Sequence, residues 1–253
     1  MSTIWLTEDD DFFQGTANSD TIFGLEGADT IFGRDGHDSI NLGENDDEGY
    51  GGAGNDSIEG EAGNDTLDGG EGSDTLVGGE GNDLQFGGAG NDHLIDNDGN
   101  ETLYGGAGND VADGGQGNDE IYGDEGRDRL FGGADNDSLF GGDGNDVLRG
   151  ENGDDKLFGD AGKDKMWGGA DDDEFLFTGE TGTDKILDFN TEQDKIKIDA
   201  PGVDDFDDLI IRENRKGDAV VFVDGVTGHG ADQVVLVGVS SSALSSDDFD
   251  FGF

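Results

Sequence analysis

A nine-residue unit repeats without insertion or deletion from Gly15 to Leu176, and this repeat limits the fold more than any other feature of the chain. Eighteen consecutive units fill these 162 residues, and residues 69–77 (GGEGSDTLV) are a clean copy. A short unit cannot bury its own apolar side chains, so units must stack on one another. The repeat therefore predicts a solenoid.

Each constant position of the unit has a physical reason. Glycine at positions 1, 2 and 4 permits positive φ and close approach of neighbouring backbones. Positions 1–6 are therefore expected to form a tight turn, and positions 7–9 a very short strand whose position 8 points inward. The units depart from the pattern at Leu42 and Asp96 (position 1), at Glu101 (position 6), and at Gly49, Gln85 and Ala112 (position 8).

Position 6 is Asp in 17 of the 18 units, so its carboxylates recur every nine residues and must form columns. The whole pattern resembles the RTX family, the calcium-binding nonapeptide repeats of bacterial secreted proteins. This resemblance implies an all-β fold, a right-handed parallel β-roll with two nonads per turn. It also implies that calcium ions are held between the loops of successive turns.

With two units per turn, the position-6 residues divide into two columns of predicted calcium ligands. Column A comprises Asp20, Asp38, Asp56, Asp74, Asp92, Asp110, Asp128, Asp146 and Asp164. Column B comprises Asp29, Asp65, Asp83, Asp119, Asp137, Asp155 and Asp173 as predicted ligands, with Asp47 and Glu101 in its two irregular units. The nine stacked loops of a column leave eight gaps between them, and each gap can hold one calcium ion. If each unit without Gly at position 1 disables the two gaps beside it, column A binds calcium in eight gaps and column B in four. We therefore expect about twelve calcium ions.

Composition points to a fold that depends on this metal. The formal net charge is −50, and each turn buries only two position-8 side chains. Such a thin core and such strong repulsion favour a chain that is unfolded without calcium. The charge disfavours nucleic acid and anionic membranes as partners. The sequence has no apolar stretch long enough for a transmembrane helix, and its lack of cysteine excludes disulfides and cysteine-ligated zinc.

We expect an N-terminal cap over residues 1–14, the roll over 15–176 and a capping region over 177–253. Within the last region, residues 184–189, 194–198, 209–211, 219–223 and 233–237 have strand-like composition. Residues 179–187 are interpreted as a last nonad after a shift of register. The pattern Asp184-x-Ile186-x-Asp188-Phe189 resembles the C-terminal cap of serralysin-type proteins.

The two ends of the sequence bear on export. The N-terminus lacks the features of a secretory signal peptide. Residues 244–251 (LSSDDFDF) resemble the tail of type I secretion substrates, and the alternative is a last capping strand. The N-terminus fits a type I substrate or a fragment of a longer protein.

Two outward-facing features have alternative interpretations. Position 9 of column B carries a ladder that is apolar or aromatic except at Asp68: Phe32, Tyr50, Asp68, Phe86, Tyr104, Tyr122, Phe140, Phe158 and Leu176. The ladder is either cross-strand stacking or a docking face for a partner, a sugar or a second copy. Arg129, Arg149 and Lys165 lie outward in column A, where they either balance charge or form an anionic-polysaccharide patch.

These features support a secreted, non-enzymatic calcium-binding β-roll that folds on binding calcium outside the cell. The alternative is a polysaccharide-binding or adhesive module of an extracellular enzyme, similar to the repeat modules of alginate epimerases. The sequence contains neither H-E-x-x-H nor G-x-S-x-G, the motifs of a zincin protease and of an RTX-type lipase. We therefore predict no catalytic residues and no cofactor other than calcium.

Overall fold

The computed structural model describes residues 2–178, 182–200, 203–223 and 232–252. The chain forms two compact units, Met1–Arg129 and Leu130–Phe253. Both units consist of short β-strands that pair in parallel, and the second unit also contains antiparallel pairs. The predicted all-β class and solenoid architecture are confirmed.

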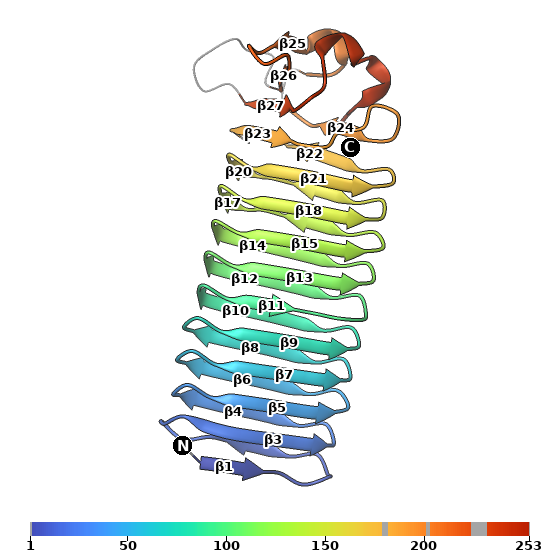
Figure 1. The fold of residues 1–253 in the computed structure, drawn as a ribbon. Helices are drawn as coiled ribbons and strands as arrows, with labels where there is room; N and C mark the ends of the chain where they lie inside the picture. Colours follow the sequence, from blue (N-terminus) through green and yellow to red (C-terminus); the bar gives the residue numbers. More distant parts are fainter. Residues whose placement is uncertain (1, 179–181, 201–202, 224–231, 253) are drawn as a thin grey trace. The chain divides into compact units, whose positions relative to one another are not determined.

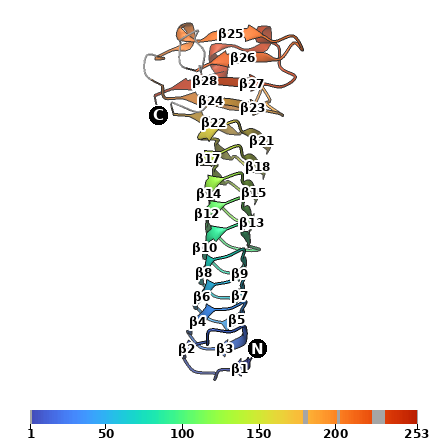
Figure 2. The ribbon, with the colours of Figure 1, turned by 90° about the vertical axis from the view of Figure 1, so that its left-hand side faces the viewer.

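In the first unit the strands alternate between two parallel sheets, because each loop reverses the chain after one nonad (Figure 1). One sheet has the order β1 (Ser2–Trp5), β3 (Asp20–Glu26), β5 (Ser39–Glu44), β7 (Ser57–Ala62), β9 (Thr75–Glu80), β11 (His93–Ile95) and β13 (Val111–Gln116). The other has the order β2 (Phe12–Gln14), β4 (Thr30–Asp35), β6 (Glu48–Ala53), β8 (Thr66–Glu71), β10 (Leu84–Gly90), β12 (Thr102–Gly108) and β14 (Glu120–Gly126). Figure 2 shows the odd- and even-numbered strands of this unit on opposite sides.

Paired residues in these sheets are eighteen apart, so one turn contains two nonads. Ile22 pairs with Ile40, and Ile40 pairs with Ile58. These position-8 side chains are no more than 1% exposed, and they form the narrow core between the sheets. At the N-terminus, β2 pairs with β4 and places Phe13 opposite Ile31. Residues 12–14 therefore add a strand in register with the strands of the roll.

The second unit continues the same construction and then changes it. One sheet has the order β15 (Arg129–Ala134), β18 (Val147–Asn152), β21 (Lys165–Ala170), β23 (Thr183–Ile186), β27 (Gln233–Leu236), β26 (Ala219–Phe222) and β25 (Ile210–Glu213). The other has the order β16 (Ser138–Phe140), β19 (Lys156–Phe158), β22 (Glu174–Phe177), β24 (Lys195–Ile198) and β28 (Phe249–Phe251). The remaining elements are β17 (Asp143–Gly144), β20 (Ala161–Gly162) and the 3₁₀ turns η1 (Phe206–Asp208), η2 (Ser241–Ala243) and η3 (Ser246–Asp248).

The register shifts after Leu176, as the sequence predicts. Lys165 pairs with Lys185, twenty residues on, and Glu174 pairs with Lys195, twenty-one residues on. The predicted last nonad begins outside the described residues, but its strand is present as β23. All five strands expected in this region are observed, and β28 ends the described chain beside β24. Within the described part of the chain, no helix has the length and apolar character needed to cross a bilayer.

Candidate metal centre

The position-6 aspartates stand at the end of each loop, immediately before the strand, and they turn into the interior. In the first unit, Asp56, Asp74 and Asp92 are 2–3% exposed. One carboxylate oxygen of each is used by the fold: the backbone N–H of Asp56 donates to Asp74 Oδ1 at 2.7 Å, and that of Asp74 donates to Asp92 Oδ1 at 2.8 Å. The same bond recurs from turn to turn, so the columns connect successive loops.

The second carboxylate oxygen has no such partner. Oδ2 of Asp56, Asp74 and Asp92 is buried without a hydrogen-bond donor. Its surroundings can be located from the neighbouring glycine: a Cβ atom on Gly69 would lie 2.6 Å from Asp74 Oδ2 and 2.7 Å from the carbonyl oxygen of Gly87. Each gap thus brings a buried carboxylate oxygen close to a backbone carbonyl of the next turn. A bare anionic oxygen in this position is costly unless a cation binds it.

The donor set fits a hard divalent cation such as calcium, which binds carboxylate and carbonyl oxygens. Among the described residues, no group of three or more His, Cys, Asp or Glu side chains comes together to hold a metal ion. A cation in these gaps would therefore need backbone carbonyls besides the aspartates. This requirement explains why the loops are so rich in glycine.

The loops stack closely enough to exclude side chains at some positions. Gly54 has φ +139°, and a Cβ atom there would lie 1.3 Å from the carbonyl oxygen of Gly36 in the preceding turn. Any residue other than glycine would force the loops apart. Stacking of backbone on backbone is what brings the carbonyl oxygens to the carboxylates.

Burial makes the bare carboxylates reluctant to ionise. It raises the pKa of Asp74 to about 6, that of Asp65 to about 7 and that of Asp173 to about 8, against the partly compensating effect of the backbone N–H bond. Neighbouring carboxylates of the same column raise these pKa values further. A bound cation would remove both penalties, since it favours the ionised form.

Every predicted calcium ligand is buried in the structure. The column A set is Asp20, Asp38, Asp56, Asp74, Asp92, Asp110, Asp128, Asp146 and Asp164, and the column B set is Asp29, Asp65, Asp83, Asp119, Asp137, Asp155 and Asp173, all at most 3% exposed. Asp47 and Glu101, which the prediction left out, are buried equally well. Their role as ligands remains a proposal.

The structure also adds two residues to the columns. The backbone N–H of Asp164 donates to Asp184 Oδ1 at 3.0 Å, and that of Asp173 donates to Asp194 Oδ1 at 3.3 Å. Both acceptors are buried. The signal was present in the sequence, because Asp184-Lys-Ile and Asp194-Lys-Ile repeat the Asp-x-apolar order of positions 6–8. The nonad expected at residues 179–187 already places Asp184 at position 6, whereas Asp194 lies outside any expected nonad.

The irregular unit at Leu42 keeps its loop oxygens together. Leu42 is fully buried, and its side chain occupies the space left by Gly49, where a Cβ atom would lie 3.0 Å from Leu42 Cδ1. The carbonyl oxygen of Leu42 still lies beside Asp29 Oδ2, since both are within 2.5 Å of the Cβ position of Gly24. In this unit the apolar core side chain is therefore at position 1 and not at position 8, and the carbonyl oxygen that could bind a cation is kept.

The outward ladder of column B is stacked, as one of its two interpretations predicts. Ring centroids are 4.6 Å apart between Phe32 and Tyr50, 4.8 Å between Tyr104 and Tyr122, and 4.4 Å between Phe140 and Phe158, all with nearly parallel planes. These contacts stabilise neighbouring strands. Docking of a partner on this face stays a hypothesis.

The basic residues singled out in column A have different surroundings. Arg129 and Lys165 are exposed. The Arg149 guanidinium carbon lies 4.7 Å from the centre of the Trp167 ring and 5.9 Å from that of Phe131, so this side chain stacks on aromatic rings. Lys165 instead joins Lys163 and Lys185 around a hollow of about 280 Å³.

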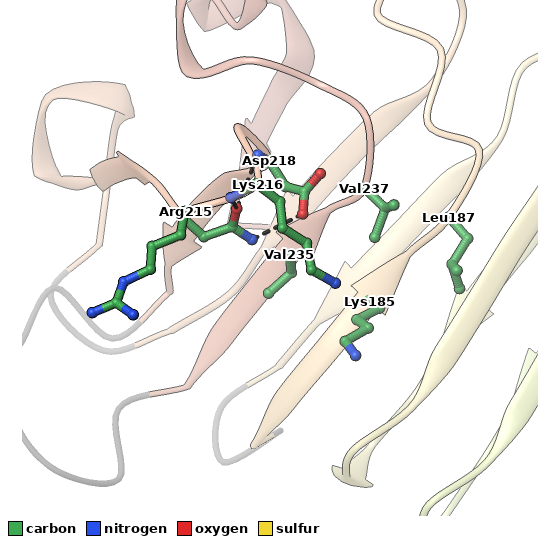
Figure 3. Close-up of a pocket in the computed structure, with 8 residues that line it drawn as sticks. Lys185, Leu187, Arg215, Lys216, Asp218, Val235 and Val237 are labelled. Atoms are coloured by element: carbon green, nitrogen blue, oxygen red, sulfur yellow. Dashed lines mark hydrogen bonds between the residues drawn. The ribbon is translucent and has the colours of Figure 1, made fainter.

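A larger hollow of about 600 Å³ lies on the outer face of β23 and β27. Figure 3 shows its apolar side chains, Leu187, Val235 and Val237, together with Lys185 and Lys216. Arg215 and Asp218 also line it, and the Asp218 carboxylate accepts hydrogen bonds from Asn214 Nδ2 and from the backbone N–H of Gly238. The sequence did not indicate this hollow.

Comparison with known proteins agrees with the geometry of the loops. A family model described as the RTX calcium-binding nonapeptide repeat (4 copies) matches residues 5–40, 14–49, 42–76, 50–85, 77–112, 108–139 and 140–175. These matches together extend from residue 5 to residue 175, well over half of the chain. A search of curated proteins finds no match.

Two solved structures are similar to the chain. One is the solution structure of the AlgE6R3 subunit from the Azotobacter vinelandii mannuronan C5-epimerase, with 28% identity over 49% of this chain and 78% of that chain, and a TM-score of 0.40. The other is the crystal structure of the extracellular lipase LipA from Serratia marcescens, with 20% identity over 96% of this chain and a TM-score of 0.35. The chain spans 40% of the length of that lipase chain.

Proposed function

Because the chain belongs to the RTX family of calcium-binding nonapeptide-repeat proteins, we propose that it is a secreted protein whose β-roll folds on binding many calcium ions outside the cell. The observation that carries this proposal is the column of buried aspartates, in which residues such as Asp56 and Asp92 have one oxygen that accepts a backbone N–H of the preceding loop and one oxygen without a donor.

The residues divide the work of binding between them. Position-6 carboxylates such as Asp74 supply the negative charge, carbonyls such as that of Gly87 supply neutral oxygen ligands, and the loop glycines let these groups approach. Calcium supplies a positive charge that links neighbouring loops. Since the site exists only when the loops are stacked, the free energy of binding becomes free energy of folding.

From the gaps between units that keep Gly at position 1 we propose about twelve ions, eight in column A and four in column B, following the loop-ligand chemistry of calcium. Their ligands are the sixteen position-6 aspartates of the two predicted sets. Calcium in a bacterial cytosol would be too scarce for weak sites, so the chain would stay extended until export. Residues 244–251 are the proposed type I secretion signal. We further propose that the protein acts by binding and catalyses no reaction, because its carboxylates recur with the structural repeat.

A calcium titration tests the proposal. Far-ultraviolet circular dichroism and sedimentation velocity of the full chain, first in chelator and then with rising calcium, should show a cooperative gain of β-structure and compaction. Magnesium at the same concentration is the control, since its demand for small octahedral sites makes it a poor substitute. A chelated chain with full β signal and a compact sedimentation profile would contradict calcium-coupled folding.

A second candidate function is binding of an anionic polysaccharide. It is favoured by Lys163, Lys165 and Lys185, which line one hollow on a chain of net charge −50. Replacing Arg129, Arg149 and Lys165 with serine should weaken binding to a polyuronate in a salt-dependent assay and leave the calcium response intact. Because Arg149 is stacked on Trp167, Lys165→Ser and Lys185→Ser together are the sharper variant. If the affinity for the polyuronate is unchanged, these lysines serve only to balance local charge.

A further inference from the structure

The gap between the units that begin at Gly78 and Asp96 differs chemically from the regular gaps. In a regular gap one carboxylate oxygen faces a neutral carbonyl: the Cβ position of Gly51 is 2.6 Å from Asp56 Oδ2 and 2.7 Å from the Gly69 carbonyl oxygen. At Gly78, the two nearest atoms to the Cβ position are both carboxylate oxygens, Asp96 Oδ2 at 2.0 Å and Asp83 Oδ2 at 2.4 Å. A second negative charge stands where other gaps offer a carbonyl.

These two oxygens are close together and shielded from water. They lie at most 4.4 Å apart, the sum of their distances from the Gly78 Cβ position. Asp83 and Asp96 are each 3% exposed, and Asp83 Oδ2 has no hydrogen-bond donor. Two buried carboxylate oxygens at this separation repel each other strongly unless a positive charge lies between them.

The fold holds Asp96 in this position with several donors. The backbone N–H of Asn97 donates to Asp96 Oδ1 at 2.8 Å, and Gln85 Nε2 donates to Asp96 Oδ2 at 2.8 Å and to the carbonyl oxygen of Ile95 at 3.1 Å. Gln85 occupies position 8, where most units have a large apolar residue, and it is fully buried. Its Oε1 is a further buried oxygen without a donor.

The departures from the repeat therefore occur together. Gln85 and Asp96 are in hydrogen-bond contact, and Glu101, in the same unit as Asp96, has both carboxylate oxygens buried without a donor. Random damage to a repeat would leave a cavity or an exposed loop. Here a polar core residue orients the carboxylate that replaces a glycine, and the unpaired Oδ2 of Asp83 lies beside that carboxylate.

We propose that Asp83 and Asp96 jointly hold one calcium ion in this gap, through two carboxylates in place of one carboxylate and one carbonyl. Gln85 is a positioning residue that orients Asp96 by its Nε2–H bond. The proposal rests on the calcium-binding function and adds one ion to the about twelve expected from regular gaps. Because calcium affinity rises with the negative charge of the ligands, this ion should bind more tightly than those of the regular gaps.

The test counts and locates the ion in the full chain. Equilibrium dialysis at the lowest calcium concentration that saturates the unmodified chain should show one ion fewer for Asp96→Asn. Asp98→Asn is the matched control, because it removes the same charge from an exposed position of the same loop and should leave the count unchanged. Asp96→Gly restores the residue of the repeat and should keep a foldable loop, with roughly tenfold weaker binding in this gap.

A crystal structure of the calcium-loaded chain decides the matter directly. Anomalous density about 2.3–2.6 Å from both carboxylates would support the proposal. An ion bound by Asp83 and backbone alone, or unchanged counts and affinity in both Asp96 variants, would overturn it. Gln85→Leu should weaken this one ion without moving the midpoint of the others, whereas a purely packing role would leave all ions unaffected. Loss of calcium binding at every gap in the unmodified chain would instead contradict the proposed function.

Discussion

Buried aspartates occur in both the nonad loops and the C-terminal strands, but they are satisfied differently. Asp218, beside β26, accepts hydrogen bonds on both carboxylate oxygens, from Asn214 Nδ2 at 2.9 Å and from the Gly238 N–H at 3.0 Å. Asp74, in the roll, has a donor on Oδ1 and none on Oδ2. Correspondingly, the side chain of Asn214 lowers the pKa of Asp218, whereas burial raises that of Asp74 to about 6.

The apolar core is also thinner in the nonads than in the C-terminal strands. A nonad contributes one inward position, filled by a side chain such as Leu76 or Leu94. In the C-terminal strands, β26 and β27 pair antiparallel and bury Val221, Val234 and Leu236 together. The C-terminal strands therefore pack on one another through apolar side chains, while the proposed function makes the nonad loops depend on calcium. Four experiments can test whether the nonad loops and the C-terminal strands are stabilised in these different ways.

Removal of calcium should have the largest effect, and mainly on the loops. In excess chelator, hydrogen exchange of amides such as those of Asp56 and Asp92, which join successive turns, should accelerate by on the order of 10³-fold or more. Amides of β26 and β27 should retain more protection, because apolar burial and not a cation supports them. Exchange measured by mass spectrometry in calcium and in chelator gives both values. Equal loss of protection in the two regions would contradict the comparison.

The C-terminal strands should in turn control how the roll responds to calcium. Replacing residues 219–223 with polar residues changes none of the proposed calcium ligands, but it removes the buried Ala219, Val221 and Val223. If these strands order the last turn first, the calcium-induced gain of circular dichroism should be abolished. A response that persists at higher calcium would show that the roll nucleates elsewhere.

Much of this contrast can be predicted from the sequence, because it is periodic. The nonad places apolar side chains inward and carboxylates in columns, and the observed eighteen-residue pairing of Ile22 with Ile40 follows that pattern. The β-strands after residue 183 were also predictable, from runs such as Ala219-Val-Val-Phe. In both regions, local alternation and spacing were sufficient.

The consequences of breaking the repeat could not be predicted, because they depend on contacts between turns. Leu42 and Asp96 both lack the glycine of position 1, and the sequence suggested the same damage for both. In the structure Leu42 fills the space left by Gly49, while Asp96 meets Gln85 and Asp83. Gly49 belongs to the same nonad as Leu42, but Gln85 and Asp83 belong to the nonad one turn before Asp96, so no pattern within a single nonad reveals their contact.

A matched pair of glycine substitutions sharpens the comparison at smaller scale. Gly54 and Gly217 both have positive φ, so alanine introduces backbone strain at either. At Gly217 nothing lies within 4 Å of the new Cβ, whereas at Gly54 the Gly36 carbonyl oxygen lies 1.3 Å away. Gly54→Ala should therefore raise the calcium midpoint severalfold, and Gly217→Ala should leave it nearly unchanged. Equal midpoints in calcium titrations of the two variants would show that the loops can separate freely.

The smallest effect should be a pH dependence whose sign reverses with calcium. Burial raises the pKa of Asp56 to about 6 and of Asp65 to about 7, above the ordinary value for an unfolded chain of about 3.9. A raised pKa means that the metal-free folded state binds protons more tightly than the unfolded state. The contribution of each such carboxyl to the stability of the metal-free folded state is complete below about pH 4 and is lost as pH rises through 6–7.

Calcium needs the ionised carboxylates, so protons compete with it. Between pH 8 and 5.5, acidification should thus stabilise any folded population in chelator and weaken calcium binding, by about tenfold in calcium midpoint per pH unit for each proton displaced per ion. Asp218, whose pKa is lowered by the side chain of Asn214, stays charged in this window. The effect therefore reports on the carboxyls whose pKa is raised by burial, which include the position-6 columns. Thermal melts and calcium titrations at matched ionic strength give both slopes, and slopes of the same sign would mean that the columns are not where protons and calcium compete.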